Sequence, residues 1–159
     1  MIAEGVSVSS RPSPLLDAAR ATARETLRLG PVPLDADAVR LRRYVITDLA
    51  AALQGDRSRG VLIAVGAALH AALADFDLRA AGPWSASGKA LPRALAAMDP
   101  PLAERFTRAF AALSAESNLD SVQALVGAVL FPYGGRLREC FRQGAPTAWR
   151  DVSCAPSTG

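Results

Sequence analysis

The sequence predicts an all-α fold, a bundle of five to seven helices, from three observations. Half of the 159 residues are apolar, and only 6% are aromatic. Alanine and leucine dominate the apolar set and favour helices, whereas the β-branched and aromatic residues that favour strands are sparse. Apolar residues also recur at helical spacing between Pro- and Gly-containing breaks at 30–33, 55, 82–88 and 132–135.

The first two helices are expected over about residues 13–29 and 35–54. Ser13 and Pro14 are typical of an N-cap and a first helical position, and the prolines within 30–33 end the helix because proline cannot continue the hydrogen-bond ladder. The apolar face of the first helix consists of Leu15, Leu16, Ala19, Ala23, Thr26 and Leu27. The second helix is expected to bury Val39, Tyr44, Val45, Leu49 and Leu53 and to expose Arg40, Arg42 and Arg43.

The third helix, about residues 57–81, is apolar almost all round, so we expect it in the middle of the bundle. Asp56 is its expected N-cap, and Gly60 and Gly66 permit a neighbouring helix to approach closely. A short helix over 89–98 follows the loop 82–88, and Asp99 is the expected N-cap of the next helix. Residues 117–131 then predict a helix whose core stripe is Leu119, Val122, Leu125, Val126, Val129 and Leu130.

A single helical domain over 13–150 follows from these elements. A final turn or two of helix is expected over 136–143, and a disordered tail over 151–159. The stretch MIAEGVSV, within 1–12, is partly alternating like a strand, but no other strand is predicted to pair with it. It is therefore either a loop or a remnant whose partner strands are missing.

Composition argues against several functional classes. The net charge is only +3, and basic residues cluster only in RLRR at 40–43, so a nucleic-acid partner is disfavoured. Two cysteines, Cys140 and Cys154, are too few for a disulfide framework or a metal site, which favours a cytoplasmic location. We expect no membrane span, because no apolar stretch of roughly 18 residues stands out, and no signal peptide.

Lys89 is the only lysine in the chain, beside 17 arginines, and it follows a Gly-containing loop. A P-loop has four residues between its glycines and a Ser or Thr after the lysine. Here five residues separate Gly82 from Gly88, and Ala90 follows the lysine. A P-loop is therefore excluded.

The same stretch allows two other interpretations. A lysine at the start of a helix attracts anions, Trp84 can stack on a base or sugar, and Ser85 and Ser87 can form hydrogen bonds with a ligand. The structural alternative is that the serines cap the short helix and that Trp84 closes the edge of the core. The residues alone leave both interpretations open.

Two acidic residues, Asp75 and Asp77, lie on the third predicted helix. Positions two apart point to nearly opposite faces, so the two carboxylates cannot hold one metal ion. His70 and Asp77 share a face and can form a hydrogen-bonded pair, although a lone His in an apolar helix is more often structural. With one histidine and no nucleophile elbow, the chain offers no catalytic triad.

The order of landmarks over roughly residues 30–150 resembles the C-terminal helical region of bacterial nucleotidyltransferase-domain proteins, the group that includes kanamycin and streptomycin nucleotidyltransferases. The stretches that carry the resemblance are GPVPLDADAVRLRRYVITDLAAAL, WSASGKALPRALAAMDPPLAERF and VLFPYGGRLRECFRQGAPTAWR. The matching landmarks are Trp84, Gly88–Lys89, Leu91–Arg93, Asp99–Pro100, Leu102–Ala103, Gly134–Gly135, Ala145–Pro146 and Trp149–Arg150. The chain departs from the family pattern at Ala90, where an aromatic residue is common, and at Cys140, where glycine is usual.

The resemblance implies a binding domain without its catalytic partner. Family members carry an α/β catalytic domain whose Gly–Ser and Asp-x-Asp motifs hold Mg²⁺ for nucleotidyl transfer, and neither motif occurs in this chain in that context. MIAEGVSV resembles the last segment of that domain, so Met1 is expected to be an internal methionine. Mg²⁺ and a nucleoside triphosphate are implied only for the complete two-domain assembly, and no cofactor is implied for this chain alone.

Site residues also follow from the resemblance. Lys89 is expected to face phosphate, with Trp84, Ser87 and Arg93 near it. Asp48 and Asp77 are candidates to face a small cationic acceptor on the basis of their helix faces, not of the resemblance. The expected function is a helical substrate- and nucleotide-binding domain that pairs with a nucleotidyltransferase catalytic domain in cis or in trans and is inactive alone. This hypothesis predicts an exposed apolar surface where that domain docks.

The alternative function is a free-standing helical module of a two-component, toxin–antitoxin-like pair. The ribonuclease version of such modules has an arginine followed, after four to six residues, by a histidine. Here Arg59 lies eleven residues before His70, so ribonuclease activity is disfavoured. An independent small-molecule enzyme is the least favoured interpretation, because no catalytic set is present.

Overall fold

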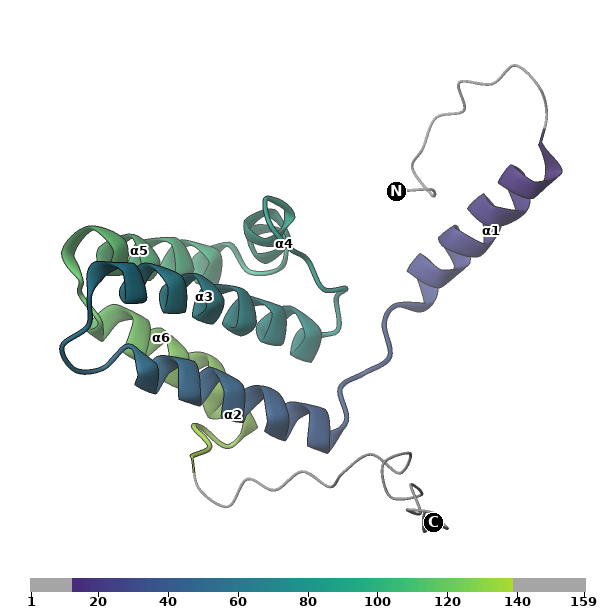
Figure 1. Cartoon of the computed structure of the whole chain (residues 1–159). Helices are drawn as coiled ribbons and strands as arrows, with labels where there is room; N and C mark the ends of the chain where they lie inside the picture. The colour runs from purple at the N-terminus through teal and green to yellow at the C-terminus, as the bar shows by residue number, and fades with distance from the viewer. Residues whose placement is uncertain (1–12, 139–159) are drawn as a thin grey trace, which may run out of the picture.

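The computed structural model describes residues 13–138, and every regular element within this range is helical (Figure 1). The elements are α1 (Pro14–Leu29), α2 (Ala36–Ala52), α3 (Arg59–Ala81), α4 (Ala90–Met98), α5 (Pro100–Glu116) and α6 (Asp120–Leu130), followed by the 3-10 helix η1 (Phe131–Tyr133). The predicted all-α fold with five to seven helices is confirmed. The predicted segment over 1–12 and the tail over 151–159 lie outside the described residues.

Four helices make a bundle in which each helix packs mainly on two of the other three. α2 packs against α3 and α6, and α5 packs against the same two helices from the other side. The short connections between α2 and α3 and between α5 and α6 make each pair an antiparallel hairpin (Figure 1). α4 connects the hairpins and packs on α3 and α5 near the C-terminal end of α3.

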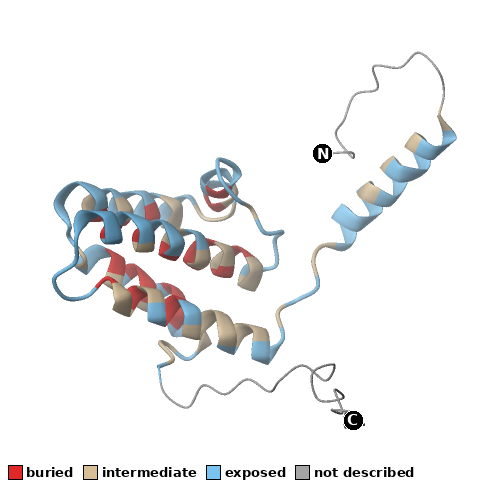
Figure 2. Ribbon diagram, in the orientation of Figure 1, coloured by how far each residue is buried: buried red, intermediate tan, exposed pale blue. Residues whose placement is uncertain are grey.

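The core lies between these four helices and α4, where the buried residues gather in Figure 2. Phe76 of α3 is fully buried, and its ring meets Tyr133 of η1 edge-on, with centroids 4.9 Å apart. Phe106 of α5 is also fully buried. The predicted stripe of α6 is confirmed for five of its six positions; the sixth, Leu119, is only partly buried.

Side-chain caps fix most helix starts. Ser13 Oγ accepts a hydrogen bond from Leu16 N, and Asp99 Oδ1 accepts one from Leu102 N, as predicted. The prediction for the third helix was wrong, because Ser58 and not Asp56 is its N-cap. Asp56 precedes the cap by two residues, too early to reach the amides of the first turn.

The buried face of α2 differs from the predicted one. Ile46, Thr47 and Ala50 are buried, whereas Val45 is 40% exposed. Val39, Tyr44 and Leu49 are only partly buried, and Leu53, predicted as buried, is fully so. The core side of the helix thus includes Ile46, Thr47 and Ala50 in place of Val45, and Thr47 joins the core through a hydrogen bond that hydrophobicity does not reveal. Its hydroxyl oxygen accepts a hydrogen bond from Leu137 N at 3.1 Å.

Two arginines of α2 that were predicted to be exposed have specific partners. Arg42 forms an ion pair and hydrogen bond with Asp75 of α3, and both side chains are partly buried. Arg43 donates to Gly134 O at 2.7 Å and to Gly135 O at 2.9 Å. These bonds connect α2 to α3 and to the turn after η1, so the basic run is not a solvated face. Arg40, in contrast, is exposed as predicted.

A short strap, defined as residues 134–137, closes the bundle after η1. Besides the bonds to Arg43 and Thr47, Arg136 donates to the main-chain O and the Oε1 of Gln123, whose amide nitrogen donates in turn to Ala50 O. Residues 136–138 are not helical, so the helix predicted over 136–143 does not start there. The rest of that predicted helix lies outside the described residues.

The first helix forms as predicted, but it does not join the bundle. None of the residues of α1 is buried, and none of the principal helix–helix interfaces involves it. Figure 1 shows α1 standing apart at the end of the linker 30–35. Leu15 is 84% exposed. Its apolar face therefore has no partner among the described helices.

The third helix is central, but it is not covered all round. It packs on α2, α4, α5 and α6, yet Val61 and Ile63 are 42% and 54% exposed. By length and composition, α3 is the one helix within 13–138 that is apolar enough to cross a membrane, which corrects the expectation that no such stretch exists. The core helix of a globular bundle meets the same criterion, and Leu69, Leu73 and Phe76 are fully buried inside this bundle.

Candidate functional site

The predicted nucleotide-binding residues lie at one corner of the bundle, where α3 ends and α4 begins. α3 stops at Gly82, which has a left-handed backbone (φ 104°) that glycine adopts without strain. Arg79, in the last turn, donates to Pro83 O at 3.4 Å and to Val32 O at 2.5 Å. One guanidinium thus holds both the loop 82–88 and the linker 30–35. We call the residues 79–93 the corner.

The serines of the loop do not cap α4. Its N-cap position is Lys89, and no side chain accepts a hydrogen bond from its first turn. Instead, Ala90 N donates to Ser87 O at 3.1 Å, Leu91 N donates to Gly88 O at 3.2 Å, and Pro92 has no N–H. The capping interpretation is therefore wrong. The first-turn amides are also already paired, so an anion at this corner would depend on side chains.

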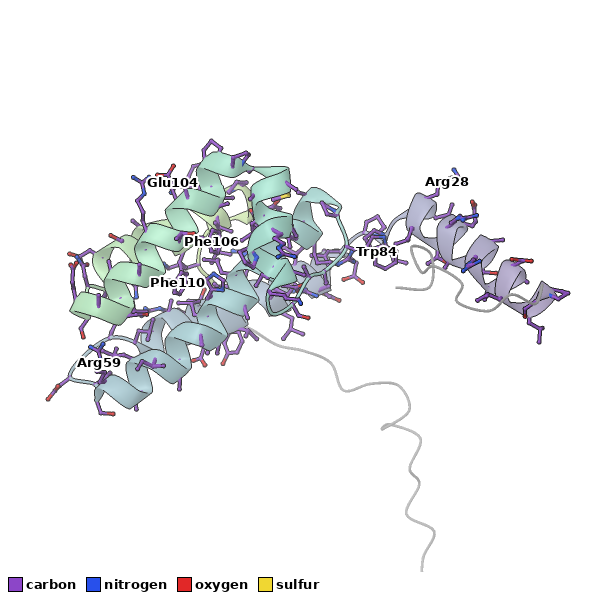
Figure 3. All side chains as sticks on the ribbon, turned by 90° about the horizontal axis from the view of Figure 1, so that it is seen from above. Arg28, Arg59, Trp84, Glu104, Phe106 and Phe110 are labelled. Atoms are coloured by element: carbon purple, nitrogen blue, oxygen red, sulfur yellow. The ribbon has the colours of Figure 1, made fainter. Side chains whose placement is uncertain are left out.

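Two cations and an indole are accessible there. Lys89 and Arg93 are four residues apart, which places them on one face at the start of α4, and both are exposed. Trp84 is 44% exposed, and in Figure 3 it projects from the bundle on the side that faces α1. Trp84 therefore does not close the core. Ser87 is exposed in the same loop.

A groove of about 340 Å³ lies beside the corner. Its walls come from the linker 30–35, the end of α3 and η1. Leu29, Pro31, Leu34, Arg79, Gly82 and Tyr133 are among the residues that line it. A mostly apolar groove with one guanidinium and one phenol at its wall suits a flat ring that carries a few polar atoms. Arg79 and Tyr133 were not among the predicted site residues.

Asp77 lies on the other side of α3 from Asp75 and does not pair with His70. Its Oδ2 is buried and has no hydrogen-bond partner among the described residues. Burial raises the pKa of this carboxyl, and the charge of Asp99 raises it further. His70 instead packs edge-on against Phe106 and Phe110, with ring centroids 5.7 and 4.8 Å away, and burial lowers its pKa. The structural interpretation of His70 agrees with these contacts.

Asp77→Asn is expected to stabilise the protein at neutral pH. Because the pKa of Asp77 is raised in the folded state, the carboxyl favours folding below its unfolded pKa of about 4, and this contribution is lost as the pH rises through the folded pKa. The advantage of the Asn variant should therefore grow between about pH 4 and pH 7, to about 1 kcal/mol. Urea unfolding of both proteins across this range measures it; an advantage that is constant or shrinks with pH would contradict the assignment.

Asp48 lies apart from the corner. It is exposed on α2 and lines a separate pocket of about 240 Å³ with Tyr44, Thr47, Leu137 and Arg138. No contact or pocket that we describe joins it to Lys89 or to Asp77. Trp84, Ser87, Lys89 and Arg93 are thus brought together by one loop and one helix turn, whereas the two candidate acceptor carboxylates are on different helices.

Metal binding and relatedness complete the description of the site. Within residues 13–138, no three His, Cys, Asp or Glu side chains are grouped so that they could hold a metal ion. No protein-family model matches the chain, and neither the curated proteins nor the solved structures contain a significant match to it.

Proposed function

We propose that this chain is a helical substrate- and nucleotide-binding domain that works with a nucleotidyltransferase catalytic domain, in cis or in trans. The observation that supports the proposal best is the accessible set at the corner: Trp84, Lys89 and Arg93 are all exposed there, and none of the hydrogen bonds or ion pairs that we describe engages their side chains. An indole and two cations are the groups that recognise a base or sugar and the phosphates of a nucleotide.

In this assembly, the helical domain supplies binding and orientation only. Lys89 and Arg93 would neutralise phosphate oxygens, and Trp84 would stack on the base or the sugar. Mg²⁺ and the catalytic carboxylates would belong to the other domain, which performs the transfer. A cationic acceptor would be attracted by Asp77 or Asp48.

Lys89→Ala is the test. The full chain is combined with a catalytic domain that carries the Gly–Ser and Asp-x-Asp motifs, and binding of Mg-ATP is measured by calorimetry. We expect the dissociation constant to rise about 10- to 100-fold, because one charge-assisted phosphate contact is lost. Lys89→Arg should retain most of the affinity.

Arg108→Ala is the matched control. Arg108 is an exposed cation on α5, in only a long ion pair with Glu104 at 3.8 Å, so its loss changes the net charge equally without touching the corner. Equal effects of Lys89→Ala and Arg108→Ala, or no effect of either, would contradict the proposed role of Lys89.

A second candidate function is a free-standing interaction module of a two-component pair. The observation that favours it is α1, an amphipathic helix without a partner among the described elements. This function requires no nucleotide at the corner. It therefore predicts that Lys89→Ala leaves the properties of the assembly unchanged, the opposite of the result expected above.

A further inference from the structure

The groove between α3 and α5 is filled at one end and open at the other. α4 covers the end near the C-terminus of α3, where Leu91 and Leu95 are buried. The open half has a volume of about 360 Å³, and Leu62, Ile63, Gly66, Ala67, His70 and Phe110 are among its lining residues. Figure 3 shows Phe110 in this region between α3 and α5, with Arg59 toward the far end of α3. We call this open half the α3–α5 groove.

The α3–α5 groove has the character of a helix-binding surface. None of its lining residues carries a full charge, and His70 is held toward its neutral form because burial lowers its pKa. Its floor is Gly66, where a Cβ atom would come within 2.9 Å of Leu113 Cδ2, so α3 and α5 approach closely below it. Ile63 on its rim is 54% exposed. Single apolar residues are common on protein surfaces, but a continuous uncharged groove marks a binding site.

The chain itself contains a helix that fits such a groove. α1 has one uncharged face, with Leu16, Ala19, Ala23 and Leu27, and its charged residues lie on the other half of the helix, with Arg20 at the edge beside Leu16. We call the uncharged face the α1 stripe. A 16-residue helix is marginal in water by itself, so α1 needs a surface to pack on. From Leu16 to Leu27 the stripe is about 17 Å long, and the residues of α3 that line the groove, from Leu62 to His70, span about 12 Å, so the stripe is long enough to cover the groove.

The linker directs α1 away from its own bundle. Pro31 and Pro33 fix φ on either side of Val32, and the carbonyl of Val32 is held by Arg79. Gly30 turns the chain with φ 75° just after α1 ends. To cover the groove of its own chain, α1 would have to fold back through this braced segment. A second copy can meet the α1 stripe without any change in the linker.

We propose that α1 is an exchanged arm: in a homodimer, the α1 stripe of each chain packs into the α3–α5 groove of the other. This arrangement covers both apolar surfaces of each chain at once, and it closes with twofold symmetry because each chain gives one arm and receives one. The exchanged α1 would extend the surface that α4 already forms on α3 and α5. The proposal does not depend on nucleotide binding at the corner.

The first test is the mass in solution of the full chain and of two single variants, measured by light scattering after size exclusion over a concentration series. We expect the chain to have about twice its 16.6 kDa. Leu16→Glu places a charge in the stripe and should raise the dimer dissociation constant at least about 30-fold. Arg24→Glu is the matched control on the charged face of α1 and should leave the dimer intact. A monomer at every concentration, or a dimer insensitive to Leu16→Glu, overturns the proposal.

The second test distinguishes an exchanged arm from other contacts. Ala67→Arg blocks the groove at an exposed position, so it should produce monomers without unfolding the bundle, which circular dichroism verifies. Mixing Leu16→Glu chains with Ala67→Arg chains leaves one intact arm and one intact groove in each mixed pair. Energy transfer between labelled chains should then report heterodimers that neither variant forms alone. No rescue means that α1 packs in its own chain or on another α1, and overturns the exchange.

Discussion

Replacing Phe76 by Ala is expected to lower the free energy of unfolding by about 3–5 kcal/mol, the range for a large aromatic residue removed from a packed core. The Phe76 ring is fully buried on α3 and meets Tyr133 edge-on at an interplanar angle of 77°. Its loss leaves a cavity and also removes one of the contacts that hold η1 on the bundle. Chemical denaturation at neutral pH measures the change.

Phe131→Ala is the matched control, since it removes the same side chain from a position that is 81% exposed. We expect a change within about 0.5 kcal/mol for it. If the two variants lost similar stability, Phe76 would not be the core residue that its burial indicates.

Replacing Arg43 by Ala is expected to lower the free energy of unfolding by about 2–3 kcal/mol. Its guanidinium donates two charge-assisted hydrogen bonds to the carbonyls of Gly134 and Gly135, at 2.7 and 2.9 Å. Both glycines have positive φ, 94° and 71°, which glycine adopts without strain, so the loss measures the two bonds and not a strained turn. Denaturation measured by circular dichroism gives the loss.

Arg40→Ala controls for the loss of a cation from the same helix. Arg40 is exposed and only 3.9 Å from Asp37, a distance at which a surface ion pair contributes little. Its change should stay within about 0.5 kcal/mol. Arg43→Lys should recover only part of the stability, because an ammonium lacks the fork that reaches both carbonyls. Equal losses in Arg40→Ala and Arg43→Ala would show that the two bonds contribute nothing specific.

The sequence could predict what depends on neighbours along the chain. Helix number and the caps at Ser13 and Asp99 follow from local propensity and capping, and these predictions were confirmed. The choice between nearby capping residues was harder: Asp56 and Ser58 are equally suitable by type, and only the start of α3 decides between them. The serines of the loop before α4 are also suitable caps by type, but the capping role expected for them was wrong.

Features that depend on distant residues could not be predicted. Arg42 and Arg43 look like a solvated basic run until Asp75 and Gly134 are brought beside them. Thr47 belongs to the core because its hydroxyl has a main-chain partner 90 residues away, in Leu137. No hydrophobic pattern encodes such a partner, so the burial of Thr47 could not be predicted, whereas Ile46 and Ala50 lie at helical spacing to Leu53 and were missed.

The candidate site likewise combines features that depend on neighbours along the chain with features that depend on distant residues. The loop with Trp84 and the helix start at Lys89 could be predicted from the local sequence, whereas Arg93 was added only through the family resemblance. The role of Arg79 was not, because it joins two segments, at Val32 and Pro83, that are 51 residues apart in sequence. Amphipathic α1 was also recognised, but an apolar stripe does not say which surface covers it.

The strap has a consequence for the order in which the fold forms. The α2–α3 and α5–α6 hairpins are local and can form within microseconds to milliseconds, as helical hairpins with short connections do. The bonds from Arg43 and Thr47 to residues 134–137 close loops of about ninety residues. During synthesis, α2 leaves the ribosome well before its partners in the strap exist. The contacts between residues far apart in the sequence therefore form last and complete the bundle. Until then, α2 and α3 must persist as a hairpin that has the Arg42–Asp75 ion pair but only part of its core.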